Sequence, residues 1–465
     1  MTAGRAAASA PRRVAFEVLR RTFEDAAWTD RALRAAADRS DLEGRERAQA
    51  QRLAYGAVQR RGTTDHLLGE LADRPLEKLD PPVVAALRLG IYELLFSSAT
   101  PDHAAVDQAV ALAREGLVAA GAPSGKAQAA AGLVNAVLRR AAGEGEGLHA
   151  GLEDSTPEAA AVKHSYPDWL ARMWWAQLGA ADALALMAAM NEPSETAFRV
   201  NTLRADPAAL AEQLRRAGER VEGPHDRSEP SWPPEAIVAD GAVGDALRAE
   251  VVSGRLWPQS RASQAVVAIL EPRPGERVLD LCAGPGIKTT AIAARLGDRG
   301  AVVAVERDAG RASQIRELCE RAAATSVRVQ VADALEADLG SGYDRVLVDP
   351  PCSDLGTLAS RPDARWRKSP QQIERLATLQ SEILASGAEA LRPGGTLVYA
   401  TCTISERENE AVVISALDAR GDLRAQDLGA QSPGLASSHD SRFLQLRPDR
   451  HRTDGFFCAR LVREG

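Results

Sequence analysis

The hydrophobic positions of the first 140 residues recur with the period of a helix. In VAFEVLRRTF the apolar side chains at positions 14, 18, 19 and 23 fall on one helical face. The segments QRLAYGAVQRR, VVAALRLGIYELLF, HAAVDQAVALARE and KAQAAAGLVNAVLRRA continue this pattern, and prolines punctuate it. Residues 1–140 are therefore predicted to form an all-α domain.

The pattern changes after position 140. The stretch AAGEGEGLHAG is small and glycine-rich, which predicts a linker over residues 141–164. YPDWLARMWWAQLG then predicts a helix whose tryptophans pack in a core. TAFRVNTL and two short apolar runs near 236–238 and 251–256 follow it. We expect residues 165–260 to form a small α+β module.

Residues 261–465 alternate strand-like and helix-like segments. Strands are expected at 277–282, 301–306, 327–333, 343–349 and 396–402, with a late strand at 456–462. Helical patterns lie between them. This alternation predicts a Rossmann-like, doubly wound α/β sheet, in which ligands bind at the carboxyl ends of the strands.

Charge and composition restrict the possible partners and compartment. The chain has 465 residues, enough for several domains, and a net charge of −7. The first 140 residues carry 20 Lys+Arg and 17 Asp+Glu, so binding to nucleic acid would depend on local basic patches. No long apolar run or signal peptide is visible. These features predict a cytoplasmic protein without a membrane segment, and we expect a monomer.

The five cysteines are odd in number and widely spaced. The chain contains no Cys-x-x-Cys pair and no His-x-x-x-His pair, so neither a disulfide framework nor a metal site is predicted. Reduced thiols fit this pattern better.

A glycine turn follows the first strand of the α/β region. It reads LCAGPGIKTT and leads into a helix, so a ligand can approach its backbone closely. It is not a Walker A loop, because Ile287 stands where that motif needs glycine before the lysine. It is not a dinucleotide fingerprint either, because Thr289 occupies the third glycine position. A simple structural turn remains the alternative.

Acidic residues end three successive strands of this region. Glu306 stands 22 residues after Gly284, where a carboxylate can accept both hydroxyls of a ribose. Asp333 could meet an adenine amino group, and Asp349 ends the next strand. Together these acids fit S-adenosylmethionine better than NAD. The alternative is that they only cap the following helices.

Two cysteines follow neighbouring strands at the same predicted edge. Cys352 comes just after Asp349, and Cys402 ends the next strand. A thiolate that adds to carbon 6 of cytosine activates carbon 5 for methylation, and a second thiol can assist proton removal or product release. Buried structural thiols are the alternative. We favour that alternative for Cys319 and Cys458.

The motifs LDLCAGPGIKTT, VDPPCSDLGT, YATCT…ENE and DGFFCARL resemble the RNA cytosine-5 methyltransferases of the Sun/RsmB type. The resemblance implies that Cys402 is the nucleophile and that Cys352 assists product release. It implies an S-adenosylmethionine pocket formed by Cys282, Ala283, Gly284, Pro285, Gly286, Ile287, Lys288, Glu306, Asp333 and Asp349.

The resemblance extends over nearly the whole chain. YGAVQRRGTTDHLL and LRLGIYELLF are similar to the NusB-like RNA-binding domain of that family. The implied substrate is 16S ribosomal RNA, with Arg199 and Asn201 near the RNA or the catalytic face. The basic stretch RPDARWRKSP adds Arg365, Arg367 and Lys368 as candidate phosphate contacts, although a solvated loop would carry the same residues.

The chain departs from the family pattern at four places. Ile287 replaces the second of two glycines before the lysine, and Glu306 replaces an aspartate. Ser260 stands where an acid is expected. After Cys352 the usual Ser-Gly-x-Gly reads Ser-Asp-Leu-Gly.

Two other functions compete with this prediction. The sequence DPPC resembles the Asp-Pro-Pro-aromatic motif of amino-group methyltransferases acting on DNA, but Cys352 takes the place of the aromatic residue. A non-enzymatic RNA-binding or ribosome-assembly factor would retain the fold without the chemistry. The intact cysteines and pocket acids argue against that second alternative.

Overall fold

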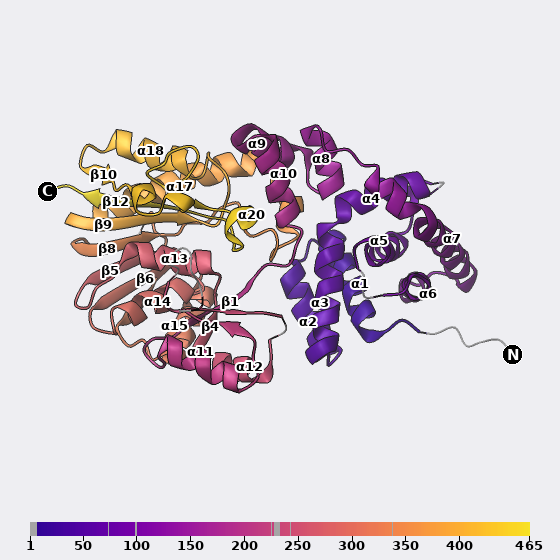
Figure 1. Ribbon diagram of the computed structural model, residues 1–465, viewed down its shortest axis with the longest axis horizontal. Coiled ribbons are helices and arrows are strands. Elements are labelled where there is room, and N and C mark those ends of the chain that lie inside the picture. The colour runs from indigo at the N-terminus through magenta and orange to yellow at the C-terminus, as the bar shows by residue number, and fades with distance from the viewer. Residues whose placement is uncertain are drawn as a thin grey trace. The chain divides into compact units, whose positions relative to one another are not determined.

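The computed structural model describes residues 7–72, 74–97, 100–224, 226, 233–241, 243–336 and 338–465. The chain forms two compact units (Figure 1). The helical unit comprises Met1–Glu192 together with Leu358–Arg367, and the sheet unit comprises Pro193–Thr357 together with Lys368–Gly465.

The helical unit confirms the prediction of an all-α N-terminal region. Its elements are α1 (Ala10–Phe23), α2 (Thr29–Arg39), α3 (Gly44–Gln59), α4 (Arg61–Leu71), η1 (Leu76–Lys78), α5 (Pro81–Phe96), α6 (Asp102–Ala119), α7 (Ser124–Ala150), α8 (Pro157–His164), α9 (Asp168–Leu178) and α10 (Ala180–Ala189). Prolines open α5 and α8, where their missing N–H costs no hydrogen bond. Among the described helices, none has both the length and the hydrophobicity needed to cross a membrane.

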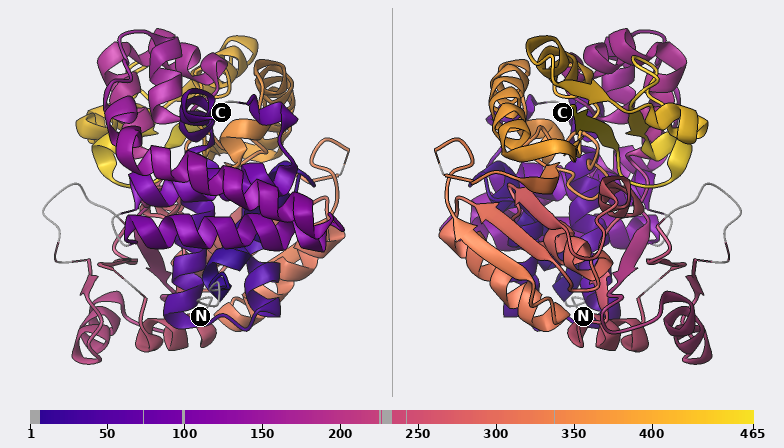
Figure 2. Two further views of the ribbon diagram at one scale, coloured as in Figure 1. Left: turned by 90° about the vertical axis from the view of Figure 1, so that its right-hand side faces the viewer. Right: turned by 90° about the vertical axis from the view of Figure 1, so that its left-hand side faces the viewer.

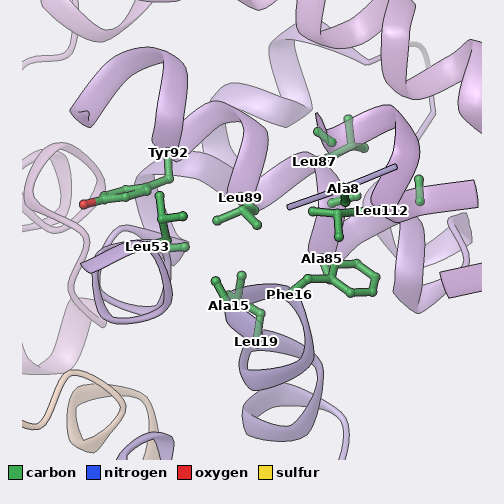
Figure 3. Close-up of a cluster of buried hydrophobic side chains, with 14 of the residues drawn as sticks. Ala8, Ala15, Phe16, Leu19, Leu53, Ala85, Leu87, Leu89, Tyr92 and Leu112 are labelled. Carbon is green, nitrogen blue, oxygen red and sulfur yellow. The ribbon is translucent and has the colours of Figure 1, made fainter. Parts of the chain in front are cut away.

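Apolar side chains from several helices form the core of this unit (Figure 3). Leu19 comes from α1, Leu53 from α3, Leu89 and Tyr92 from α5, and all four are buried. Gly56 lets α3 approach α5 closely, because a Cβ at that position would lie 2.1 Å from the Tyr92 ring. The helical stripes in the sequence therefore correspond to a packed core.

The prediction of a linker over residues 141–164 is wrong. Helix α7 continues to Ala150, and α8 occupies much of the remainder. Gly145 is buried because its bare backbone faces Leu95; a Cβ there would lie 3.1 Å from a Leu95 methyl carbon. Small residues in this stretch thus permit close helix packing rather than flexibility.

A segment from far along the chain completes the helical unit. Leu358–Arg367 belongs to it and contains the short helix α16 (Ala364–Arg367). The Trp366 indole N–H donates to the Val58 carbonyl at 2.8 Å. The Arg365 guanidinium donates to the Ser165 carbonyl at 3.1 Å and stacks on the Tyr166 ring, 4.1 Å from its centre. The residues that flank this segment belong to the sheet unit.

The first part of the sheet unit is a small antiparallel sheet. It consists of β1 (Thr196–Val200), β2 (Val221–Glu222), β3 (Ala236–Ala239) and β4 (Leu256–Pro258), in the order β2-β3-β1-β4, with α11 (Pro207–Arg216) and α12 (Asp245–Val252). The predicted middle module therefore has its α+β character. Its expected start at residue 165 differs from the boundary between units, which falls after Glu192.

The second part is the predicted doubly wound sheet, whose parallel strands lie side by side in the right-hand view of Figure 2. Its strand order is β10-β12-β9-β8-β5-β6-β7, with β11 paired to β12. The strands are β5 (Arg277–Leu281), β6 (Ala301–Glu306), β7 (Val327–Val331), β8 (Tyr343–Val348), β9 (Leu391–Thr401), β10 (Leu423–Ala425), β11 (Leu444–Leu446) and β12 (Phe456–Arg463). The helical elements are α13 (Arg261–Leu270), α14 (Ile287–Arg295), α15 (Ala309–Ala322), α17 (Pro370–Ala390), α18 (Glu410–Ala419), α19 (Leu428–Gln431), η2 (Pro433–Leu435) and α20 (Pro448–His451).

The strand order places the candidate residues. Strands β9, β8, β5, β6 and β7 are parallel, and the sequence order reverses between β5 and β8. Ligands of such sheets bind beyond the carboxyl ends of the strands at this reversal.

Candidate active site

Four predicted site residues stand at one edge of the large sheet. Cys282 follows β5, Glu306 ends β6, Asp349 follows β8 and Cys402 follows β9. Because these strands are parallel neighbours, their carboxyl ends meet at the same edge. The structure thus brings the glycine turn, the acids and the thiols to one edge, as the sequence pattern predicts.

The glycine turn is held by the acid at the end of β6. The Gly284 N–H donates to one Glu306 carboxylate oxygen at 3.1 Å, and the Asp308 N–H donates to the other at 2.9 Å. A Cβ at position 284 would lie 2.2 Å from the Glu306 oxygen, so glycine is required there. Gly286 has a φ of +103°, which also favours glycine. The two glycines therefore let the turn pack closely against Glu306 and Ile315.

The three predicted pocket acids differ in their surroundings. Glu306 is buried, whereas Asp333 and Asp349 are partly exposed. One Asp333 oxygen accepts the Leu335 N–H at 3.0 Å. Each carboxylate keeps acceptor capacity beyond these bonds. Such acceptors at neighbouring strand ends fit the hydroxyls and amino groups of S-adenosylmethionine.

Lys288 forms an ion pair within this edge. Its Nζ lies 2.6 Å from the Asp349 Oδ2 and 5.2 Å from the centre of the Phe456 ring. Burial opposes the positive charge, but the nearby Asp349 carboxylate raises the pKa of Lys288 overall. The lysine of the glycine turn therefore orients an acid of the pocket instead of binding a phosphate.

Asp280 is a buried acid that sequence reasoning did not select. It lies inside β5 and accepts a hydrogen bond from the Thr289 hydroxyl at 2.6 Å. Burial raises the pKa of Asp280 to about 7. The signal that could have identified it is an acidic residue inside the otherwise apolar stretch VLDLC. Its bond to Thr289 ties the strand to the first turn of α14.

The two predicted catalytic cysteines are in direct contact. Their sulfurs lie 3.2 Å apart, and the Cys402 thiol donates to the Asp354 Oδ1, also at 3.2 Å. The hydrogen bond with the Cys352 thiol, burial, and the nearby acids raise the pKa of Cys402 well above that of an ordinary thiol. Cys402 therefore rests as a neutral thiol, so any attack by its sulfur would require a base to accept the proton.

The ligand atoms of Cys352, Asp354 and Cys402 lie within 4.8 Å of one another. Two sulfurs bound to one tetrahedral zinc ion at about 2.3 Å would stand roughly 3.8 Å apart. The observed sulfur–sulfur distance of 3.2 Å is shorter. The sulfurs are thus closer together than zinc coordination would place them, and we assign no metal ion to these side chains.

Lys368, expected at an RNA phosphate, lies beside this group. Its Nζ is 3.3 Å from the Asp354 Oδ2 and 3.4 Å from the Cys352 carbonyl oxygen. Asp354 itself adopts a φ of +59°, a left-handed conformation that aspartate tolerates better than most residues. The sequence showed Asp354 only as a departure from a family pattern, because its contact with Cys402 spans 48 residues.

A buried polar network joins the two cysteine loops. Glu408 accepts from the Ser353 N–H at 2.8 Å and from the Gln380 amide at 3.0 Å. The Ser353 and Thr403 hydroxyls are 2.7 Å apart, and the Asn409 amide donates to the Thr403 carbonyl at 3.1 Å. Burial raises the pKa of Glu408. These contacts explain the ENE segment as the support of both loops.

The remaining cysteines lie in different surroundings. Cys458 is fully buried within β12, and Cys319 is buried on α15. Burial raises the pKa of Cys458 to about 12 and that of Cys319 to about 11. Cys282, at a φ of +60° in the glycine turn, has its pKa raised to about 12, again chiefly by burial.

The prediction that Arg199 and Asn201 lie near RNA is corrected, because both side chains are buried. They are 3% and 1% exposed, respectively. The Arg199 guanidinium donates to the Gln259 side chain at 2.7 Å and to the Thr290 hydroxyl at 2.9 Å. The Asn201 amide donates to two backbone carbonyls. Arg199 thus links β1 to α14, whereas Asn201 links the residue after β1 to the end of α15, and protein groups occupy these donors.

The two arginines of the basic stretch also have protein partners, and the prediction for Arg365 is corrected. Arg365 is fully buried in the helical unit, so RNA cannot reach it. Arg367 is partly exposed; it donates to the Ala26 carbonyl at 2.9 Å and stacks on Trp28, 4.6 Å from the ring centre. Its donors are largely taken up by the helical unit.

Ser260 shows how one departure from the family pattern fits the fold. It is the N-cap of α13, and its hydroxyl accepts the Ser263 N–H at 3.4 Å. Serine and aspartate are both good N-cap residues. The substitution therefore preserves the capping contact.

Three family descriptions match successive parts of the chain. The NusB family matches residues 9–143, and the ferredoxin-like domain of RsmF/B-like methyltransferases matches residues 166–237. The description "16S rRNA methyltransferase RsmB/F" matches residues 267–462.

Curated relatives and a solved structure agree with these matches. A probable ribosomal RNA small subunit methyltransferase B from Synechocystis sp. is 32% identical over 97% of this chain and 98% of its own length. Ribosomal RNA small subunit methyltransferase B from Thermus thermophilus is 34% identical over 93% of this chain and 92% of its own. A methyltransferase homolog protein from Pyrococcus horikoshii, 27% identical, superposes with a TM-score of 0.59 over 67% of this chain and 100% of its own. The chain therefore belongs to the RsmB/F family of S-adenosylmethionine-dependent ribosomal RNA methyltransferases.

Proposed function

We propose that the protein methylates carbon 5 of a cytosine in 16S ribosomal RNA through a covalent bond between Cys402 and carbon 6 of that base. The observation that carries this proposal is the contact between two thiols, 3.2 Å apart, at the ends of β8 and β9, on one side of the glycine turn that follows β5. Methylation of an exocyclic amino group would need no pair of thiols. Neither would a purely RNA-binding role.

The chemistry requires a nucleophile because carbon 5 of cytosine is itself a weak one. S-adenosylmethionine supplies the electrophilic methyl group. Attack of the Cys402 sulfur on carbon 6 makes the C5–C6 bond single and forms an enamine across C4 and C5, whose carbon 5 can take that methyl group. Loss of the carbon 5 proton and departure of the sulfur then restore the aromatic ring.

The two thiols are not equivalent, which supports their separate roles. Cys402 is partly exposed and hydrogen-bonded to a carboxylate, as expected of a nucleophile whose proton must leave. Cys352 is buried and its own sulfur touches that of Cys402. From there it can assist removal of the carbon 5 proton or release of the product.

The remaining polar groups of this edge would position the reactants. Glu306, Asp333 and the glycine turn would hold the cofactor. Asp349, fixed by its ion pair with Lys288, would accept the cytosine amino group or contact N3. The target base must leave its stack to reach Cys402, so loops or partly unfolded RNA are favoured substrates.

The test is methylation of RNA by purified protein. Wild type, Cys402→Ala and Cys319→Ala would each receive methyl-labelled S-adenosylmethionine and 16S RNA transcribed in vitro, and bisulfite sequencing would locate the product. We expect one protected cytosine with wild type and Cys319→Ala, and none with Cys402→Ala. Label in RNA without a protected cytosine, or normal activity of Cys402→Ala, would contradict the proposal.

A further inference from the structure

Asp354 is the carboxylate in contact with the predicted nucleophile. Its Oδ1 accepts the Cys402 thiol proton at 3.2 Å, and its Oδ2 lies 3.3 Å from the Lys368 ammonium group. The left-handed backbone at Asp354 turns this short side chain toward the thiols. The carboxylate is thus oriented by a hydrogen bond on one oxygen and an ion pair on the other.

From this geometry we propose that Asp354 is a catalytic residue, the general base that takes the proton of Cys402 as the sulfur attacks the cytosine. The proposal rests on the proposed function, because it assumes that Cys402 is the nucleophile. It goes further by assigning the proton that must leave the thiol to one named atom, the Asp354 Oδ1.

The proton and electron balance of the step is complete. The Cys402 S–H bond breaks and its proton moves to the Asp354 carboxylate, while the sulfur forms a bond to carbon 6. The π electrons of the C5–C6 double bond shift to form an enamine across C4 and C5, with the negative charge carried by N3, so carbon 5 becomes nucleophilic. Carbon 5 takes the methyl group from the sulfonium of S-adenosylmethionine, whose sulfur keeps the electrons of the broken bond. The carbon 5 proton is then released to solvent, its bonding electrons re-form the C5–C6 double bond, and the Cys402 sulfur departs with the electrons of the S–C6 bond. Asp354 then returns the proton to Cys402.

The resting state of the thiol explains why a base is needed. A preformed thiolate would stand beside the Asp354 carboxylate, and the repulsion would disfavour it. The raised pKa of Cys402 reflects this neighbourhood. The same carboxylate that disfavours a free thiolate is well placed to receive the proton of the neutral Cys402 thiol in the transition state. Lys368 then holds the base in place through its ion pair.

Other charged and titratable groups face this pair and must be considered in any pH experiment. They are Cys352, Asp349, Lys288 and Lys368. The Asp354→Asn substitution leaves all four in place. It keeps the size of the side chain and removes only its charge and basicity.

The main experiment measures how fast the covalent adduct forms between pH 6 and 9. The RNA would carry 5-fluorocytosine at the target position, because fluorine at carbon 5 cannot leave as a proton and the adduct is trapped. With Asp354 as base, the wild-type rate is level over this range. In Asp354→Asn only the fraction of Cys402 that has already ionised can attack. The rate of adduct formation is therefore about 10²–10⁴-fold lower at pH 7 and rises about tenfold per pH unit. Parallel profiles for the two proteins would overturn the proposal.

A matched control separates the local effect from a general one. Asp344→Asn makes the same substitution near the opposite end of β8, where Asp344 binds Arg392 at 2.7 Å. It should leave the adduct rate and its pH profile unchanged. Asp354→Gly, which relieves the left-handed backbone, should be slow in chloride and faster in formate, which can enter the vacated space as a base. Failure of formate to restore any rate would contradict the assignment.

A second measurement works without RNA, so it distinguishes failure of this inference from failure of the proposed function. The rate at which iodoacetamide alkylates Cys402 reports its thiolate and would be followed by peptide mass spectrometry. Asp354→Asn should make alkylation faster at pH 8, opposite to its effect on adduct formation. If alkylation changes as expected but no adduct forms even with wild type, the proposed function fails. If wild type forms the adduct and Asp354→Asn forms it equally fast, only the role of Asp354 fails.

Discussion

The end of β9 and the interior of β12 each carry a cysteine, and the two positions are nearly adjacent in the sheet. Cys458 pairs in register with Ala400, two residues before Cys402. Both thiols have a raised pKa, yet their partners differ: Cys458 is surrounded by core side chains, whereas Cys402 meets a sulfur and a carboxylate. Burial alone therefore does not distinguish the two thiols, whereas the groups that each sulfur contacts do.

The same contrast separates the strand interior from the strand end. At Cys458 the β12 backbone is paired on both sides, with Leu444 of β11 and Ala400 of β9, and the cysteine side chain packs in the core. Beyond β8 and β9 the chain leaves the sheet, and the polar network around Glu408 determines where each loop runs. The positions of the two cysteine loops thus depend on buried polar contacts that the Cys458 side chain does not make.

The largest effect expected from this comparison is that of Cys352→Ala. If Cys352 serves the second half of the reaction, the variant should form the covalent RNA adduct but turn over at least about 100-fold more slowly. Denaturing gels would show an RNA–protein complex that accumulates with time. Cys458→Ala should show no such complex. An equal response of the two variants would remove the functional distinction between the two positions.

The next effect concerns the support of the cysteine loops. Glu408→Ala should lower the free energy of unfolding by about 1–3 kcal/mol, because the Ser353 N–H and the Gln380 amide lose a buried acceptor. Methylation should fall as well, since the two sulfurs would no longer be held in contact. Denaturant titration and single-turnover assays would measure both quantities. A stable variant with full activity would show that other contacts hold the loops.

Arg365→Met tests the basic stretch after Cys352 in a different way. We expect a loss of about 2 kcal/mol in the stability of the protein, because the Ser165 carbonyl and the Asn191 side chain lose a buried charged donor. The salt dependence of RNA binding should stay the same, because a buried guanidinium releases no counterions from RNA. A decrease of about one in the slope of the logarithm of the RNA-binding constant against the logarithm of salt concentration would instead indicate that Arg365 contacts a phosphate.

The smallest effect is predicted for Cys458→Ala, which should cost about 1 kcal/mol of stability through lost packing and leave methylation unchanged. Its pH dependence has a definite sign. The pKa of Cys458 in the fold is about 12, whereas an unfolded thiol ionises near pH 8.5. Its contribution is therefore constant below that pH and is lost as the pH rises from about 9 towards 12. Unfolding of wild type and variant at pH 7 and 10 would reveal this difference.

Much of the fold could be predicted because the spacing of apolar residues within a short stretch indicates whether that stretch forms a helix or a strand. The helices of the first 140 residues and the strands of the α/β region were each visible in short windows. The glycine-rich stretch before residue 151 was misread as a linker because composition does not show that Gly145 packs against Leu95. The middle module was recognised, although the helix predicted at its start, α9, belongs to the helical unit.

By itself the sequence determined that two thiols, three acids and a glycine turn follow neighbouring strands, since parallel strands deliver their ends to one edge. Only the tertiary structure decided what each polar group meets. It buried Arg199 and Arg365, joined the segment 358–367 to the helical unit, and placed Asp354 against Cys402. The reason is physical: strand order follows from local pattern and chirality, whereas hydrogen-bond partners are set by packing between residues far apart in the chain.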